Sequence, residues 1–156
     1  QLNRAQGRAY HRKCSAVLGD TACGFDVMAA GYHAEVPAPA GTGVFTWPGL
    51  VDYDPGWFAR GTLRVLDGQA AGLTGVIRSD RIVGSDRRVE LWQELPVALA
   101  EGDMVRLEAG CDKGVETCRL KFHNFLNYRG FPHIPGDDWA MSYPTRHGVN
   151  DGGSLT

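Results

Sequence analysis

The sequence predicts a mainly β single domain: a small antiparallel barrel or sandwich with short helical segments at both ends. In the middle of the chain, short runs alternate apolar and polar residues, which is typical of half-buried antiparallel strands. Turn sequences such as Asp67-Gly68 and Glu101-Gly102-Asp103 separate these runs. The 21 glycines fit the many tight turns and bends of a curved sheet.

Length, charge and hydropathy exclude several classes of protein. The 156 residues have the length of one domain, 1–156, and can bury a substantial core without covalent staples. The net charge of −2 offers no basic surface for sequence-specific binding of nucleic acid. No apolar stretch approaches the roughly 18 residues of a transmembrane helix, so we expect no transmembrane segment.

The residues before the sheet are less regular. Residues 1–13 are polar and predict a short helix, which Gly7 weakens. Residues 25–32 combine apolar and small residues and predict a strand. Residues 37–43 are a connector rich in Pro, Ala and Gly, which favours a loop.

The predicted strands of the sheet cover residues 44–47, 62–65, 73–78, 87–92 and 105–108. Within 87–92, Val89 and Leu91 face one side, and Trp92 faces the other together with Arg88 and Glu90. We therefore expect Trp92 to face a partner chain. The other tryptophans, Trp47, Trp57 and Trp139, are expected to be core or interface residues.

After Gly110 the period becomes helical. Val115, Cys118, Phe122 and Phe125 are spaced by three, four and three residues, which predicts a short helix with Cys118 on its buried face. Two prolines and two glycines make residues 129–136 a rigid loop. The polar, Gly-rich end, 146–156, is expected to be frayed.

Four cysteines form two pairs at the two ends of the predicted sheet: Cys14 with Cys23, and Cys111 with Cys118. They fit four packed free thiols, two disulfides in an oxidising compartment, or a four-thiolate metal site. Structural zinc sites usually contain closer cysteine pairs, whereas iron–sulfur clusters tolerate wider spacing. Basic residues lie beside three of the cysteines and would favour thiolates and offset the charge of a cluster: Arg12, Lys13, Lys113 and Arg119.

Catalytic motifs are absent from the sequence. It contains no G-x-S-x-G, no H-E-x-x-H and no P-loop. The adjacent pair Asp137-Asp138 is interpreted as solvated turn residues, and a Cys–His pair built on His123 is disfavoured because the cysteines are paired. We therefore do not expect an enzyme.

The segments around the cysteines resemble a known family. Cys14-Ser-Ala-Val-Leu-Gly-Asp-Thr-Ala-Cys23 resembles the first half of a motif of tail-tip proteins from phages with long, flexible tails. Residues 110–118, followed by Lys121-Phe122-His123-Asn124 and residues 127–136, resemble the second half. The resemblance is to the C-terminal region of tail hub proteins of gene transfer agents and related phages, and more distantly to tail-tip protein L of phage lambda.

The resemblance implies a structural role in a hub at the tip of the tail of a virion-like particle assembled in the bacterial cytoplasm. It implies a 4Fe-4S cluster bound by Cys14, Cys23, Cys111 and Cys118, with zinc as the alternative. Its implied partners are other tail-tip proteins: a distal tail ring, a baseplate or a fibre-bearing protein. A host surface is a further possible contact, for attachment or DNA delivery. The family's ring-forming N-terminal region would lie before Gln1 and implies a homotrimer.

A four-cysteine site would tie the entry of the β domain to its exit and so act as a staple. Candidates to cover the cluster or contact its ligands are Lys113, Phe122, Phe131 and His133. Two other functions stay open: an iron–sulfur electron-transfer or redox protein, and a secreted binding module stapled by disulfides.

Overall fold

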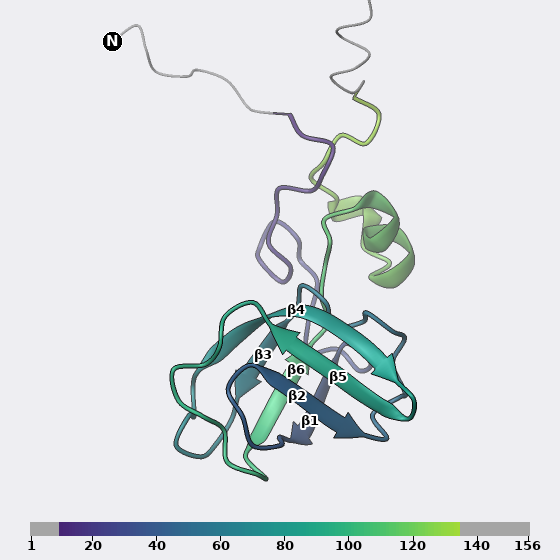
Figure 1. The fold of residues 1–156 in the computed structure, drawn as a ribbon. Helices are drawn as coiled ribbons and strands as arrows, with labels where there is room; N and C mark the ends of the chain where they lie inside the picture. The colour runs from purple at the N-terminus through teal and green to yellow at the C-terminus, as the bar shows by residue number, and fades with distance from the viewer. Residues whose placement is uncertain (1–9, 135–156) are drawn as a thin grey trace, which may run out of the picture.

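The computed structural model describes residues 10–134, which form six strands and two short helical segments (Figure 1). The strands are β1 (His33–Pro37), β2 (Val44–Pro48), β3 (Thr62–Val65), β4 (Thr74–Val83), β5 (Asp86–Leu91) and β6 (Met104–Glu108). The helical segments are the π-helical turn η1 (Thr117–Lys121) and the 3₁₀ turn η2 (Phe125–Asn127).

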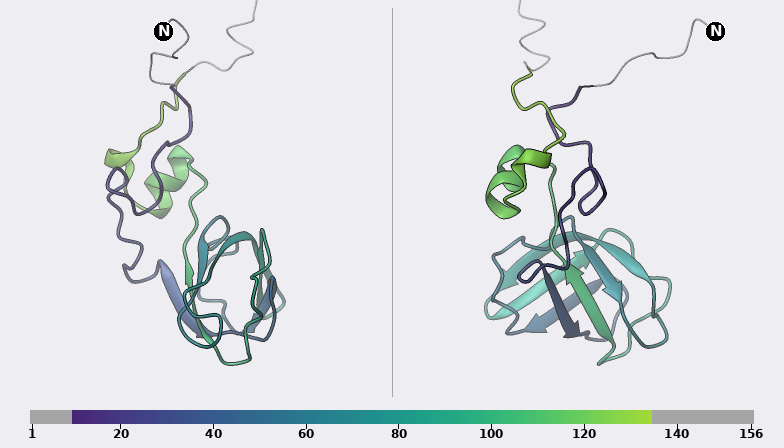
Figure 2. Two further views of the ribbon diagram at one scale, coloured as in Figure 1. Left: turned by 90° about the vertical axis from the view of Figure 1, so that its left-hand side faces the viewer. Right: turned by 180° about the vertical axis from the view of Figure 1, so that it is seen from behind.

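All six strands belong to one antiparallel sheet in the order β1-β6-β3-β4-β5-β2. The sheet curls into a half-barrel, as the two views of Figure 2 show. The two edge strands approach each other. The indole nitrogen of Trp47 in β2 donates a 2.8 Å hydrogen bond to the carbonyl oxygen of Pro37 in β1. The prediction of a mainly β, antiparallel domain is confirmed.

The inner face of the half-barrel holds the hydrophobic core. Its fully buried side chains alternate along the strands as the sequence predicts: Phe45, Leu63, Val65, Ile77, Val89, Val105 and Leu107. Trp92 is 66% exposed on the opposite face, where the guanidinium of Arg78 lies 5.4 Å from its ring centroid. Trp47 is buried, and Trp139 lies outside the described residues.

The strand predicted at residues 25–32 is wrong. Asp26 starts a turn there: its carboxylate accepts a 2.9 Å hydrogen bond from the amide of Met28, and its carbonyl accepts one of 3.1 Å from Ala29. Aspartate favours this kind of local turn over a strand. The first strand, β1, begins immediately afterwards at His33 and was missed, because its five residues bury little apart from Ala34 and Val36.

The helical prediction holds for only one end of the described chain. Residues 10–13 are not helical, and the rest of the predicted helix over 1–13 and the predicted frayed end over 146–156 lie outside the described residues. After the sheet, the predicted apolar face of the helix is present as far as Phe122, which is 4% exposed. Phe125 belongs instead to the separate turn η2 and is half exposed, because the π-helical turn η1 changes the spacing.

The two ends of the described chain lie side by side beyond one end of the sheet (Figures 1 and 2). Residues 10–24 enter there before the sheet, and residues 111–134 follow β6 into the same region. Within residues 10–134, no helical segment combines the length and apolar character needed to cross a bilayer.

Candidate metal centre

Four thiols converge at the junction of the two chain ends. Cys14, Cys23, Cys111 and Cys118 all line one hollow, which is completed by Ala16, Leu18, Lys113, Gly114, Phe122, Asn124 and Asn127. Each cysteine is half-buried, and each is a free thiol in the described structure. Residues separated by about 100 positions in sequence therefore share one site.

Cys111 is placed by the strand that precedes it. β6 ends at Glu108, and the backbone of Gly110 then runs against residues 57–61: the amide of Gly110 donates a 3.0 Å hydrogen bond to the carbonyl of Trp57. A β-carbon on Gly110 would lie 1.7 Å from the carbonyl oxygen of Ala59. Only glycine permits this approach, so the chain enters the cysteine site at a fixed point.

Cys14 is held by the segment that carries the second cysteine pair. Its amide donates a 2.9 Å hydrogen bond to the carbonyl of Lys113. Further along, the amide of Phe131 donates one of 2.9 Å to the carbonyl of His11, and the hydroxyl of Tyr128 donates one of 2.6 Å to that of Arg12. These hydrogen bonds to the backbone order the entry segment without regular secondary structure.

Cys23 ends a turn built around Asp20. The carboxylate of Asp20 accepts hydrogen bonds from the amides of Cys23 at 2.6 Å and Val17 at 2.8 Å. These bonds to the charged form, that from Cys23 first, hold the pKa of Asp20 below its ordinary value. The turn fixes the position of Cys23 relative to Cys14.

Hydrogen bonds reach three of the four sulfurs. The amide of Arg129 donates to the Sγ of Cys14 at 3.3 Å. The side-chain nitrogen of Asn124 lies 3.6 Å from the Sγ of Cys23, and the thiol of Cys118 donates to the carbonyl of Asn124 at 3.3 Å. Two of these bonds are N–H donors aimed at sulfur, and such donors influence iron–sulfur sites.

Burial and neighbouring thiols raise the pKa of Cys111 and Cys118 above its ordinary value. Burial is the largest cause at both Cys111 and Cys118, and the other three cysteines raise the pKa of Cys118 further. At Cys111 the flanking cation acts in the expected direction, but burial has the larger effect. Lys113 opposes the shift at Cys111 without overcoming burial, and Arg119 is exposed. A metal would supply the positive charge that four thiolates need.

The four residues expected to cover the site separate into two groups. Lys113 and Phe122 line the hollow, and the Lys113 ammonium donates to the carbonyl of Ala16. Phe131 does not line it. It packs edge-on against Tyr10, with ring centroids 4.8 Å apart, beside an adjacent groove. His133 is exposed and does not line the hollow either.

An aromatic cluster separates the hollow from the sheet. Phe122 packs edge-on against Phe25 at 4.9 Å between ring centroids and stacks with Tyr32 at 5.6 Å. The hydroxyl of Tyr32 donates a 2.8 Å hydrogen bond to the carbonyl of Lys121. Phe122 therefore faces the thiols on one side and anchors η1 to the turn region 25–32 on the other.

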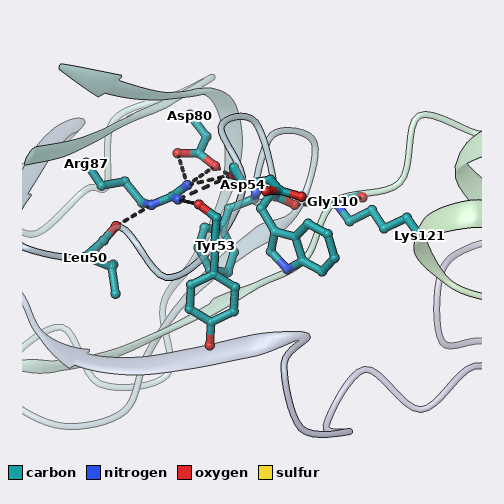
Figure 3. A network of polar contacts seen from close by, with 9 residues as sticks. Leu50, Tyr53, Asp54, Asp80, Arg87, Gly110 and Lys121 are labelled. Carbon is teal, nitrogen blue, oxygen red and sulfur yellow. Dashed lines mark hydrogen bonds and ion pairs between the residues drawn. The ribbon is translucent and has the colours of Figure 1, made fainter. Parts of the chain in front are cut away.

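A buried ion pair inside the half-barrel supports this junction (Figure 3). Arg87 is fully buried and donates to both carboxylate oxygens of Asp80, at 2.6 and 2.7 Å. It also donates to the carbonyl of Leu50 at 2.8 Å, while Asp80 accepts a 2.9 Å bond from the amide of Phe58. The pair thus fixes the loop between β2 and β3.

Lys121 extends this network to the cysteine site (Figure 3). Its ammonium donates to the carbonyls of Trp57 at 2.5 Å and Gly110 at 2.8 Å. Burial lowers the pKa of Lys121 to about 8, against the opposing effects of Cys111 and Asp80. The sequence does not predict the roles of Lys121, Asn124 and the buried ion pair. Only the inward direction of Arg87 could be inferred, because alternation along the strand places Arg87 on the same face as Val89 and Leu91.

The donors at this site are four cysteine sulfurs. Within residues 10–134, no group of three or more His, Cys, Asp or Glu side chains is arranged to hold one metal ion. A four-iron cluster is held by four cysteine thiolates, one at each iron corner. The four cysteines that line the hollow supply this number and type of donor.

Comparisons with known proteins support the part of the resemblance that concerns phages and gene transfer agents. The family described as "Phage conserved hypothetical protein BR0599" matches residues 56–138, more than half of the chain. The chain belongs to this phage family. The match includes Cys111 and Cys118 but starts after Cys14 and Cys23.

A solved structure gives a fuller match. A chain of the "Virion of native gene transfer agent (GTA) particle" is similar to this chain with 51% sequence identity and a TM-score of 0.75. The match covers 99% of this chain and 54% of that one, so this chain spans about half the length of its relative. The comparison with curated proteins finds no match.

Proposed function

We propose that this chain is a structural component of a phage-like particle, the cluster-bearing C-terminal domain of a tail hub at the host-facing tip. In this proposal Cys14, Cys23, Cys111 and Cys118 bind a 4Fe-4S cluster that staples the domain. The observation that carries it is the convergence of these four thiols on one hollow from the two ends of the chain.

The staple has a clear physical role. The half-barrel has its own core, but residues 10–24 contain no helix or strand and cover little of it. A group that binds only the folded arrangement stabilises it by mass action. Four thiolate bonds would hold this entry segment against the exit segment, in addition to the hydrogen bonds and the Tyr10–Phe131 ring contact that connect the two.

The comparisons support the location in a particle. The family is a phage family, and the similar chain is part of a gene transfer agent virion. Other virion proteins are the proposed partners, including a distal tail ring and a baseplate or fibre-bearing protein. The trimer is proposed through a region outside this chain, since the similar chain is about twice as long.

Metal analysis of anaerobically purified protein tests the cofactor. The proposal expects about four irons per chain and broad absorption near about 400 nm, as four-iron centres with four thiolates show. One zinc per colourless chain would overturn it. Cys118→Ser should lose the iron and unfold at the temperature of iron-free wild-type protein. Ser15→Ala, which removes an exposed 3.3 Å bond to the carbonyl of Arg129, should retain the iron and serves as the matched control.

A particle assay tests the location. The Cys118→Ser and Ser15→Ala changes are introduced into the full-length protein of a particle-producing cell, and the particles are imaged and tested for DNA delivery. The proposal expects defective tail tips and reduced delivery only with Cys118→Ser. Normal tips and delivery in an iron-free variant would contradict the structural role, and loss of a redox activity alone would favour an electron carrier.

A further inference from the structure

Asn124 lies between η1 and η2 and contacts residues of both cysteine pairs. Its backbone amide donates a 2.9 Å hydrogen bond to the carbonyl of Cys118. Its side-chain nitrogen donates a 2.7 Å bond to the carbonyl of Cys23 and lies 3.6 Å from the sulfur of the same residue. The amide group therefore faces Cys23 with its donor side.

A neighbour fixes this orientation. The side-chain nitrogen of Asn127 donates a 2.8 Å hydrogen bond to the Oδ1 of Asn124, so a flipped Asn124 amide would set two NH₂ groups against each other. Asn127 in turn lies over Gly24, where a β-carbon would come within 3.4 Å of its side-chain nitrogen. Gly24 has a φ of +64°, a conformation that suits glycine.

We infer that Asn124 donates an N–H···S hydrogen bond to the Cys23 thiolate and raises the reduction potential of the bound cluster, with Asn127 as the positioning residue. This inference rests on the proposed function. One-electron reduction of a 4Fe-4S cluster adds negative charge to the irons and their sulfurs and moves no proton. A hydrogen-bond donor to sulfur stabilises the more negative state, and hydrogen bonds to sulfur are among the determinants of cluster potential.

The arrangement separates the role of this donor from that of the backbone. The other N–H that reaches a cysteine sulfur in residues 10–134 is the backbone amide of Arg129, which a side-chain substitution leaves in place. Asn124 therefore offers a donor that can be removed while the four ligands stay unchanged. Leucine has nearly the same shape as asparagine and no polar atoms.

The test is a redox titration of anaerobic protein with dithionite, followed by electron paramagnetic resonance of the reduced cluster. Asn124→Leu should shift the midpoint to a more negative potential than wild type. Asn127→Leu should shift it in the same direction by less, because the amide is then free to turn. Ser15→Ala should leave it unchanged. A purely structural Asn124 would reduce the iron content but leave the potential of the remaining clusters unaltered.

The outcomes distinguish this inference from the proposed function. Wild-type protein without an iron–sulfur cluster overturns both. A wild-type cluster with an unchanged potential in Asn124→Leu overturns only the inference. If Asn124→Leu does not retain iron, the midpoint potential of Asn127→Leu decides whether the inference stands, and an unchanged potential overturns it. If neither does, reduced wild-type protein labelled with ¹⁵N-asparagine must show nitrogen coupling to the cluster by electron spin echo spectroscopy, and its absence overturns the inference.

Discussion

The ammonium group of Lys121 lies 4.4 Å from the ring centroid of Trp57 and donates a 2.5 Å hydrogen bond to that residue's carbonyl oxygen. Trp57 belongs to the loop between β2 and β3, and Lys121 ends the turn that carries Cys118. One side chain thus connects the sheet to the candidate metal centre, through a hydrogen bond and a cation–π contact.

Lys121→Met should destabilise the domain by about 1 to 3 kcal/mol, because it removes two hydrogen bonds to partly buried carbonyls while keeping most of the packing. Urea denaturation of metal-free protein measures the effect. Lys13→Met, which changes an exposed lysine, is the control and should change stability by less than about 0.5 kcal/mol. Equal effects of the two variants would contradict the bridging role of Lys121.

The pKa of Lys121 predicts a dependence on pH. Its pKa is about 8 in the folded protein, below the ordinary 10.5, so between these values the unfolded chain binds more protons than the folded one. The contribution of Lys121 to stability therefore rises as pH increases from 8 towards 10. The difference in unfolding free energy between wild type and Lys121→Met should move in favour of wild type over this range. Because both proteins keep their cysteines, the thiol titrations largely cancel, and a flat difference would contradict the depressed pKa.

Breaking the buried ion pair should be costly. Arg87→Met leaves the fully buried carboxylate of Asp80 without its partner, and we expect a loss of about 3 to 5 kcal/mol. The double variant Asp80→Leu with Arg87→Met should be more stable than Arg87→Met alone, because no uncompensated charge remains. Arg88→Met changes the exposed neighbour and is the control for urea denaturation. An Arg87→Met protein as stable as this control would show that the pair does not organise the loop.

The sheet could be predicted because the burial of each strand is visible in the alternation of its own residues. Leu63, Val89 and Leu107 sit in alternating runs, and alternation reports directly which face of a strand is buried. β1 could not be predicted in the same way, because it gains its place by pairing with β6 over residues 104–108 rather than by its own pattern. Arg87 shows that residue type alone can mislead. Its charge suggests a solvent-exposed side chain, whereas its position in the alternating strand pattern places it on the buried face.

The sequence predicts which cysteines meet, but it does not predict the residues that support them. The cysteines carry the chemistry in their own side chains, so spacing and resemblance suffice to select them. The roles of Asn124 and Lys121 depend on contacts with residues that are distant in sequence, Cys23 and Trp57, and no local pattern encodes such contacts. His133 was selected for its chemistry, yet it is exposed and away from the hollow.

Gly110→Ala should disturb the entry to the metal centre. The new methyl group would lie 1.7 Å from the carbonyl oxygen of Ala59, so the backbone before Cys111 must move. Gly31→Ala is the matched control. Gly31 has a φ of +86° and open space around it, so that change should cost only the backbone penalty of about 1 kcal/mol. We expect Gly110→Ala to lose more stability and to bind less iron, measured by denaturation and metal analysis. Unchanged iron content in Gly110→Ala would contradict the role of this crossing in placing Cys111.

Under the proposed function, removing the cluster should loosen the entry segment before the sheet. The amide of Cys14 is held by one 2.9 Å bond to the carbonyl of Lys113, whereas the buried strands β3 and β6 pair over four residues of the central sheet. Because local opening follows local contacts, treating the holoprotein with oxidant and chelator should speed hydrogen exchange at residues 14–24 and 111–118. Amides of β3 and β6 should keep their protection and provide an internal control. Equal protection of residues 14–24 with and without iron would show that the hydrogen bonds alone hold this segment, and that the cluster is not its staple.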